Sequence, residues 1–125
     1  PKYFTVLGAR ALPVELKDPD NGKSDFTRDV LYVAGTFDGE PLHLMVGHWP
    51  SRRGGESGSA WMRAAAAQVC KNAADSILNI NPNAKIVIMG DLNDDPSSKS
   101  LTKVLQAKGK SEDVPDKGLY NPWYD

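Results

Sequence analysis

Two short apolar runs, separated by one helix-length segment, constrain the fold of this chain more than any other feature. Residues 42–47 are strand-like, and residues 86–89, Ile-Val-Ile-Met, have the pattern of a short buried strand. Apolar residues recur between them at helical spacing: Met62, Ala66, Val69, Ala73, Ile77 and Ile80. A strand–helix–strand unit almost always has a right-handed crossover, so we expect the two strands to be parallel in one sheet.

Local signals give the expected limits of the neighbouring elements. Ser59 is a candidate N-cap for the helix, and Asn-Pro-Asn at residues 81–83 is a stop signal, which predicts about five or six turns. Residues 29–37 and 42–47 are joined by a connection that contains Asp-Gly, which favours an antiparallel hairpin. Residues 3–7 are also strand-like. The chain is therefore expected to form a mixed sheet with a packed helix.

Polar residues follow both strands of the predicted parallel pair. His48 ends the first strand, and Asp91 and Asn93 come directly after the second. Ligands of such sheets bind outside the carboxyl ends of the strands. We therefore expect His48 and Asp91 to share one edge of the sheet, although His48 can also be read as a plain strand-end histidine.

The Asp-rich loop after the second strand is not an EF-hand. Asp91, Asn93 and Asp95 match the opening spacing of that calcium loop. However, Pro96 stands where the calcium loop needs glycine, and Thr102 stands where it needs a bidentate glutamate. The calcium-sensor interpretation is therefore excluded.

Asp95 has a second interpretation, as the N-cap of a following helix. Pro96 would take the first helical position, and Gly109 would follow the end of the helix. The apolar face of this helix would consist of Leu101, Val104 and Leu105. This reading leaves Asp91 and Asn93 unexplained, because both come before the cap.

Composition limits the classes of partner. The chain has 125 residues, enough for one domain at most, and a net charge of −1, so it has no general attraction to nucleic acid or to anionic membranes. Any recognition of phosphate must therefore be local. No apolar run is long enough to span a membrane, and the single cysteine, Cys70, is expected to be buried in the helix. Secreted and cytoplasmic locations both stay open.

Three motifs together resemble the endonuclease/exonuclease/phosphatase family, and especially a bacterial branch of it. They are residues 27–31 (Thr-Arg-Asp-Val-Leu), 48–55 (His-Trp-Pro-Ser-Arg-Arg-Gly-Gly) and 89–97 (Met-Gly-Asp-Leu-Asn-Asp-Asp-Pro-Ser). The resemblance is dense from about Arg28 to Leu105. It implies an α/β fold like that of deoxyribonuclease I, with a mixed β-sheet and packed helices that form part of a four-layer α/β sandwich.

The resemblance also implies a chemistry, the hydrolysis of phosphoester bonds with Mg²⁺ or Mn²⁺. Asp91 would orient or deprotonate the attacking water, with at most an indirect part in metal binding. Asn93 would hold Asp91 and a phosphate oxygen. His48 would donate a hydrogen bond to the phosphate and stabilise the charge that develops there.

The loop after His48 has two interpretations. Ser51, Arg52 and Arg53 lie among glycines, and a mobile, positively charged loop suits the binding of a substrate phosphate. The same two arginines can equally belong to a solvated loop without a ligand.

Parts of the family pattern are absent from this sequence. The resemblance calls for an upstream metal-binding glutamate and a downstream Asp-His or Asp-Gln pair, and residues 1–125 contain neither. We therefore expect a single partial domain that lacks the N-terminal and C-terminal active-site segments and is inactive alone. The full-length parent is expected to be a metal-dependent phosphoesterase acting on a nucleic acid, a phospholipid headgroup or a sugar phosphate. The alternative is a non-catalytic binding module on the same scaffold.

Overall fold

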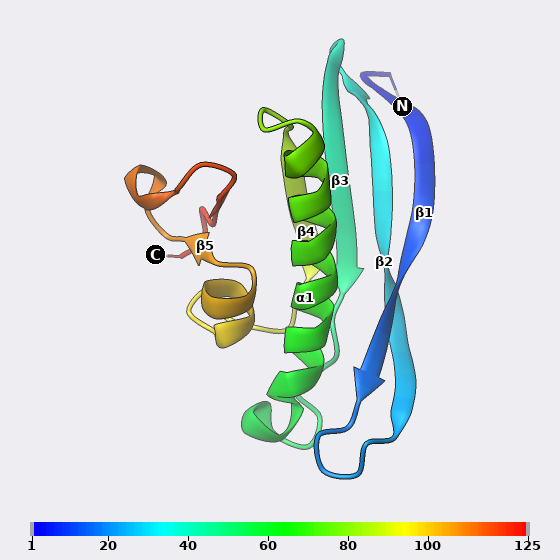
Figure 1. Ribbon diagram of the computed structural model, residues 1–125, viewed down its shortest axis with the longest axis vertical. Helices are drawn as coiled ribbons and strands as arrows, with labels where there is room; N and C mark the ends of the chain where they lie inside the picture. Colours follow the sequence, from blue (N-terminus) through cyan, green and yellow to red (C-terminus); the bar gives the residue numbers. More distant parts are fainter. Residues whose placement is uncertain (1, 125) are drawn as a thin grey trace.

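A computed structural model describes residues 2–124 of the chain, in which a four-stranded sheet carries one long helix (Figure 1). The strands lie side by side in the order β1-β2-β3-β4. Their bounds, with that of the helix, are β1 (Phe4–Lys17), β2 (Ser24–Phe37), β3 (Glu40–His48), α1 (Glu56–Ile80) and β4 (Ile86–Asp91). Shorter elements follow: η1 (Ser100–Val104), β5 (Ala107–Lys108), η2 (Ser111–Asp113) and β6 (Leu119–Tyr120). The predicted α/β class with a mixed sheet is confirmed.

The predicted strand pairings are also confirmed. β2 and β3 form an antiparallel hairpin whose two turn residues, Asp38 and Gly39, have φ values of 50° and 82°. Two positive φ values in succession fit the twist of a tight hairpin, which is why Asp-Gly is favoured there. β3 and β4 are parallel, and their register runs from His43 opposite Ile86 to His48 opposite Asp91.

β1 is longer than residues 3–7, the strand-like segment in the sequence. It extends to Lys17 and pairs with β2 through two register shifts, one between Val6 and Gly8 and one between Leu12 and Val14. Pro13 lies at the second shift. Proline is tolerated in edge strands and at bulges, so an apparent strand breaker sits within a continuous strand.

The helix α1 begins earlier than predicted. Its N-cap is Gly55, and Ser59 is a buried residue inside the first turns, so the assignment of Ser59 as the N-cap was wrong. The Ser59 hydroxyl donates to the Gly55 carbonyl oxygen at 2.7 Å and accepts a hydrogen bond from Arg63 at 2.8 Å. The Ser59 side chain is therefore hydrogen-bonded to Arg63, one turn further along the helix, and does not cap the helix N-terminus. With 25 residues, α1 has about seven turns.

The core lies between α1 and one face of the sheet. Met45 and Ile88, neighbours in the register, point toward the helix, and Cys70 is buried on the helix side as expected. The prediction that residues 86–89 form a fully buried strand was wrong, because Val87 and Met89 are 41% and 43% exposed. Alternate side chains of a strand point to opposite faces, and only one face of β4 meets the helix.

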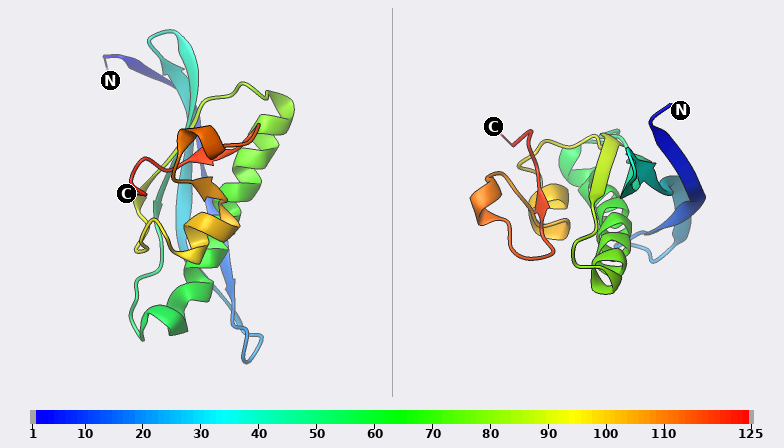
Figure 2. Two further views of the ribbon diagram at one scale, coloured as in Figure 1. Left: turned by 90° about the vertical axis from the view of Figure 1, so that its left-hand side faces the viewer. Right: turned by 90° about the horizontal axis from the view of Figure 1, so that it is seen from above.

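The segment after β4 folds along the side of α1 and β4 that faces away from β1 (Figure 2). Leu101 and Leu105 pack into the core, as expected for apolar residues in this segment. The predicted helix from Asp95 to Gly109 is reduced to η1, and Gln106, with φ 57°, follows it. Asp95 is not a side-chain N-cap; its N–H donates to the Ser98 hydroxyl instead. Within residues 2–124, no helix has both the length and the apolar character needed to cross a membrane.

Candidate active site

His48 and Asp91 lie opposite each other at the carboxyl ends of β3 and β4. His48 Nε2 is 3.8 Å from Asp91 Oδ2, and the two side chains are 50% and 66% exposed. Beneath them, Gly47 is paired with Gly90, whose φ is 129°. A β-carbon on Gly90 would overlap the Gly47 carbonyl oxygen. The predicted proximity of His48 and Asp91 therefore depends on a close backbone contact that only glycine permits.

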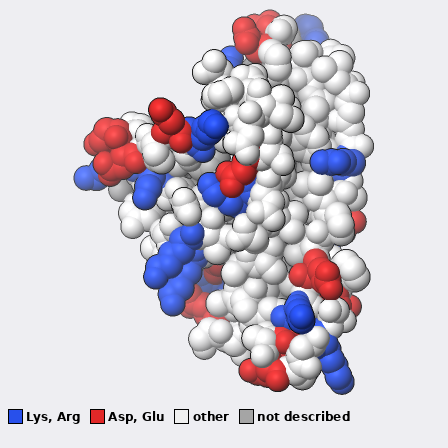
Figure 3. Space-filling model, viewed as in Figure 1, with Lys and Arg blue, Asp and Glu red and all other residues white. Residues whose placement is uncertain are grey.

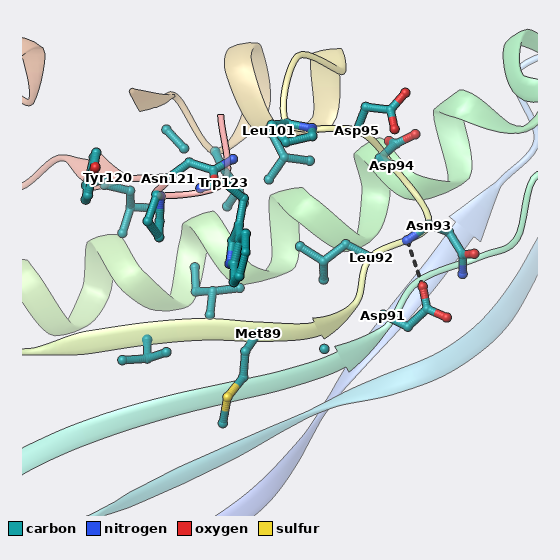
Figure 4. A pocket seen from close by; sticks show the side chains of 18 of the residues that line it. Met89, Asp91, Leu92, Asn93, Asp94, Asp95, Leu101, Tyr120, Asn121 and Trp123 are labelled. Atoms are coloured by element: carbon teal, nitrogen blue, oxygen red, sulfur yellow. Dashed lines mark hydrogen bonds between the residues drawn. The ribbon is translucent and has the colours of Figure 1, made fainter. Parts of the chain in front are cut away.

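Asn93 connects the two strand ends. Its backbone N–H donates to Asp91 Oδ1 at 3.2 Å (Figure 4), and its side-chain Nδ2 donates to the Trp49 carbonyl oxygen at 2.8 Å. Asn93 is itself in the left-handed region, with φ 53°. The expected link between Asn93 and Asp91 is thus present, but it is made by the backbone, while the side chain holds the loop after His48.

Arg52 is engaged with carboxylates. Its Nε donates to the Asn93 carbonyl oxygen at 3.0 Å, and its Nη atoms lie 3.4 to 3.5 Å from Glu56, Asp94 and Asp95. Desolvation lowers the pKa of the Arg52 guanidinium, but the negative charges of Glu56, Asp95 and Asp94 outweigh it and raise that pKa. The structure thus attaches Arg52 to the loop after β4, whereas the sequence suggested a mobile loop.

The other two residues of the predicted phosphate-binding set are exposed. The Ser51 hydroxyl accepts a hydrogen bond from the Arg53 N–H at 3.4 Å, and within residues 2–124 the Arg53 side chain forms no ion pair. Both side chains can therefore reach a ligand from solvent.

Sequence reasoning missed a buried ion pair beside the site. Arg63 of α1 and Asp94, the residue after Asn93, have side chains that are 0% and 4% exposed, with Arg63 Nε 2.8 Å from Asp94 Oδ1. Nε makes no hydrogen bond of good geometry, so the contact is an ion pair with its N–H off the line to the carboxylate. The available signal was the position of Arg63 three residues before Ala66, on the helix face that becomes buried.

A groove of about 1040 Å³ runs along β4 and ends at the polar residues. Asp91, Asn93 and Arg52 line it at that end, and Met89 and Trp123 line it further along (Figure 4). From their place at one sheet edge, Asp91, Asn93 and His48 are expected to line one concavity, with Arg52 and Arg53 at its rim. This expectation was wrong for His48, which does not line the groove, and Arg53 is also absent from its lining. His48 reaches Asp91 from the β3 side, outside the groove.

The described residues do not form a metal site by themselves. Within residues 2–124 there is no group of three or more His, Cys, Asp or Glu side chains placed to hold a metal ion. Asp94 and Asp95 face Arg52, which leaves the exposed Asp91 carboxylate as an available oxygen donor. Ligands in addition to those of the described residues are needed to hold a divalent cation here.

Charges are mixed over the surface. The face drawn in Figure 3 carries small groups of both signs, separated by uncharged areas. This distribution agrees with the net charge of −1 and gives no extended basic surface on that face.

The family follows from a match over the whole chain. The model of the Endonuclease/Exonuclease/phosphatase family matches residues 1–125. The chain belongs to this family. By its name, the family groups nucleases and phosphatases, enzymes that hydrolyse phosphoester bonds. No curated protein matches the sequence.

Solved structures agree with this assignment. Sphingomyelinase C from Streptomyces griseocarneus has a TM-score of 0.62 and 20% identity, over 84% of this chain and 35% of that one. Truncated TDP2 from Caenorhabditis elegans has a TM-score of 0.59 and 20% identity, over 82% and 36%. TDP2 from D. rerio, complexed with single strand DNA product, has a TM-score of 0.54 and 18% identity, over 82% and 35%. At these identities the likeness concerns the fold, and it confirms the deoxyribonuclease I type. The chain spans about a third of each of these proteins.

Proposed function

We propose that the full-length protein containing this chain is a metal-dependent phosphoesterase, and that this chain carries part of its active site. The observation that supports the proposal is the pair of exposed side chains, His48 Nε2 and Asp91 Oδ2, 3.8 Å apart at the ends of two parallel strands. A proton acceptor and a hydrogen-bond donor at this spacing can both contact one phosphate group and its attacking water.

Asp91 is the proposed base. Its Oδ1 accepts the Asn93 N–H, which orients the carboxylate and leaves Oδ2 on the side of His48. In this orientation Oδ2 can accept a proton from water as the water attacks phosphorus.

His48 is the proposed donor to the phosphoryl oxygens. A donor aimed at oxygens whose charge grows in the transition state is worth about 2.7–4 kcal/mol where this has been measured. Ser51 and Arg53, both exposed in the loop after His48, would add contacts to the phosphate. Arg52 shares its charge among three carboxylates, so its proposed part is to hold the Asn93 loop and, at the end of the groove, to contact the phosphate.

The proposed metal is Mg²⁺ or Mn²⁺. Asp91 is the residue of this chain that could contact it through a water molecule, and the metal's direct ligands would lie in the rest of the full-length protein. A bound divalent cation supplies neutralisation of the charge that develops on the phosphoryl oxygens.

The proposed substrate is a phosphate ester, with a nucleic acid, a phospholipid headgroup and a sugar phosphate as the three classes. The similar structures include a sphingomyelinase C and a protein complexed with single strand DNA product, so the fold accommodates both lipid and nucleic acid substrates. The net charge of −1 disfavours long duplex DNA, because phosphate contacts dominate affinity for DNA.

Hydrolysis of bis-p-nitrophenyl phosphate by the full-length protein tests this function. We expect turnover with Mg²⁺ or Mn²⁺, its loss with EDTA and its return when the metal is restored, while residues 1–125 alone give no turnover. The alternative, a non-catalytic binding module, is favoured by the absence of a three-ligand metal cluster in residues 2–124. Binding of phosphate esters by the full-length protein without turnover in any divalent metal would establish that alternative.

A further inference from the structure

We propose that Arg63 is a positioning residue, which holds the loop after β3 and the loop after β4 at the spacing that places His48 opposite Asp91. The catalytic consequence rests on the proposed function. The structural role of Arg63 does not, because it follows from contacts between described residues.

Arg63 holds the loop after β3 through two backbone carbonyls. Its Nη1 donates to Ser51 O at 3.2 Å and to Pro50 O at 3.4 Å. These carbonyls belong to the second and third residues after His48. Because the guanidinium presents its N–H groups in a rigid plane, these two hydrogen bonds fix the backbone at the point where it leaves the sheet.

Arg63 holds the loop after β4 through Asp94. Arg63 Nε is 2.8 Å from Asp94 Oδ1, and the Ser100 hydroxyl donates to Asp94 Oδ2 at 2.6 Å. Asp94 directly follows Asn93, whose N–H orients the Asp91 carboxylate. The position of Asp94 therefore limits the positions that Asn93 and Asp91 can take.

The guanidinium is itself held by α1. Arg63 Nη1 donates to the Ser59 hydroxyl at 2.8 Å, and Nη2 donates to the Glu56 carbonyl oxygen at 3.1 Å. The side chain is fully buried, so it has one geometry, set by a rigid helix. One side chain thus connects three segments, and the planar guanidinium with its five N–H groups is suited to this task.

Stability alone is a poor explanation for this arrangement. A buried ion pair carries a desolvation cost that often equals its electrostatic gain, and apolar residues of similar volume can replace it without loss of stability. A fixed spacing between two loops is a property that apolar replacements would not supply, because they donate no hydrogen bonds to carbonyls.

Two variants of the full-length protein separate these roles. Arg63→Lys keeps the charge and removes the branched set of donors. Arg63→Met combined with Asp94→Leu removes the ion pair and keeps apolar packing. The matched control is Lys71→Met, which removes a partly buried ion pair with Asp75, 3.3 Å long, on the same helix and away from the two loops.

Hydrogen exchange measures the loop spacing without reference to activity. The Trp49 N–H donates to Asp91 O at 3.0 Å, and the Asn93 N–H donates to Asp91 Oδ1. In both variants we expect protection of these two amides to fall by at least about tenfold, with protection in the β2–β3 ladder unchanged, because the opening is local. Lys71→Met should leave both amides as in the wild type.

Kinetics measure the catalytic consequence. In both variants kcat should fall by at least about tenfold while KM changes by less than about threefold, because the loss of correct positioning of His48 and Asp91 affects the transition state more than substrate binding.

Unchanged protection of the Trp49 and Asn93 amides overturns the proposal, as does reduced protection with full kcat. Loss of protection throughout β2–β3 in both variants assigns Arg63 to global stability and also overturns it. If the wild type shows no turnover, the proposed function fails, and the exchange data alone decide the structural role.

Discussion

At the scale of single residues, the site depends on a backbone contact that excludes side chains. Gly47 and Gly90 are paired directly below His48 and Asp91, and Gly90 has a φ of 129°, which other residues rarely adopt. The sequence showed that the motif contains a glycine at position 90. It did not show why glycine is needed there, because the close contact joins positions in two different strands.

Replacement of Gly90 by alanine should destabilise the protein strongly. The new β-carbon overlaps the Gly47 carbonyl oxygen, and the strained φ adds about 1–3 kcal/mol, so we expect a loss of about 3 kcal/mol or more in the free energy of unfolding. Gly58→Ala is the matched control, since Gly58 lies in α1 with open space around it and should gain up to about 1 kcal/mol. Urea unfolding checks both values, and equal stabilities for the two variants would contradict the close contact.

Cys70 supplies a prediction on pH. Burial raises the pKa of the Cys70 thiol to about 11, and the neighbouring Trp49 offsets part of this effect. Because the folded-state pKa lies above the ordinary value of 9.0, the stabilisation is complete below pH 9 and is lost as the pH rises toward 11. Relative to Cys70→Ala, the wild type should lose about 1 kcal/mol of stability between pH 8 and pH 10. Parallel pH profiles for the two proteins would show that the thiol is not buried in the folded state.

At the scale of elements, local sequence patterns predicted the hairpin, the parallel strands and the end of α1. The Asp-Gly turn, the apolar periodicity and the Asn-Pro-Asn stop are all signals carried by neighbouring residues. The start of α1 and the Arg63–Asp94 pair were not predictable in this way. Ser59 had the pattern of a cap, but its hydroxyl accepts a hydrogen bond from Arg63. The ion-pair partner of Arg63 is Asp94, 31 residues further along the sequence, so no local pattern could reveal the pair.

Small residues set the distance between α1 and the sheet. Ala67 is fully buried against the sheet, so Ala67→Leu should overpack the core and cost about 1–3 kcal/mol in the free energy of unfolding. Ala60→Leu, at an exposed position of the same helix, should change the free energy by less than about 0.5 kcal/mol. Thermal unfolding of the two variants checks this difference, and a tolerated Ala67→Leu would mean that the helix does not pack closely there.

At the scale of the whole molecule, the chain spans about a third of the length of the similar structures, and we propose that it supplies one sheet face and one set of site residues to a larger fold. Leu31, Val46 and Met89 form a row across β2, β3 and β4 on the face opposite α1, with Leu31 and Met89 exposed. His48 and Asp91 lie two residues further along their strands, on the same face. The similar structures are more than twice as long as this chain, which is compatible with the proposal that the remaining metal ligands lie outside it.

The most direct test of the proposed chemistry is the turnover of bis-p-nitrophenyl phosphate by full-length Asp91→Ala. Asp91 is exposed, so its removal should leave the melting temperature nearly unchanged, while kcat should fall by at least about a hundredfold because the proposed base is lost. Asp20→Ala, at an exposed aspartate in the turn between β1 and β2, should keep full activity. Full activity in Asp91→Ala would contradict the account and reduce the loop after β4 to a structural turn.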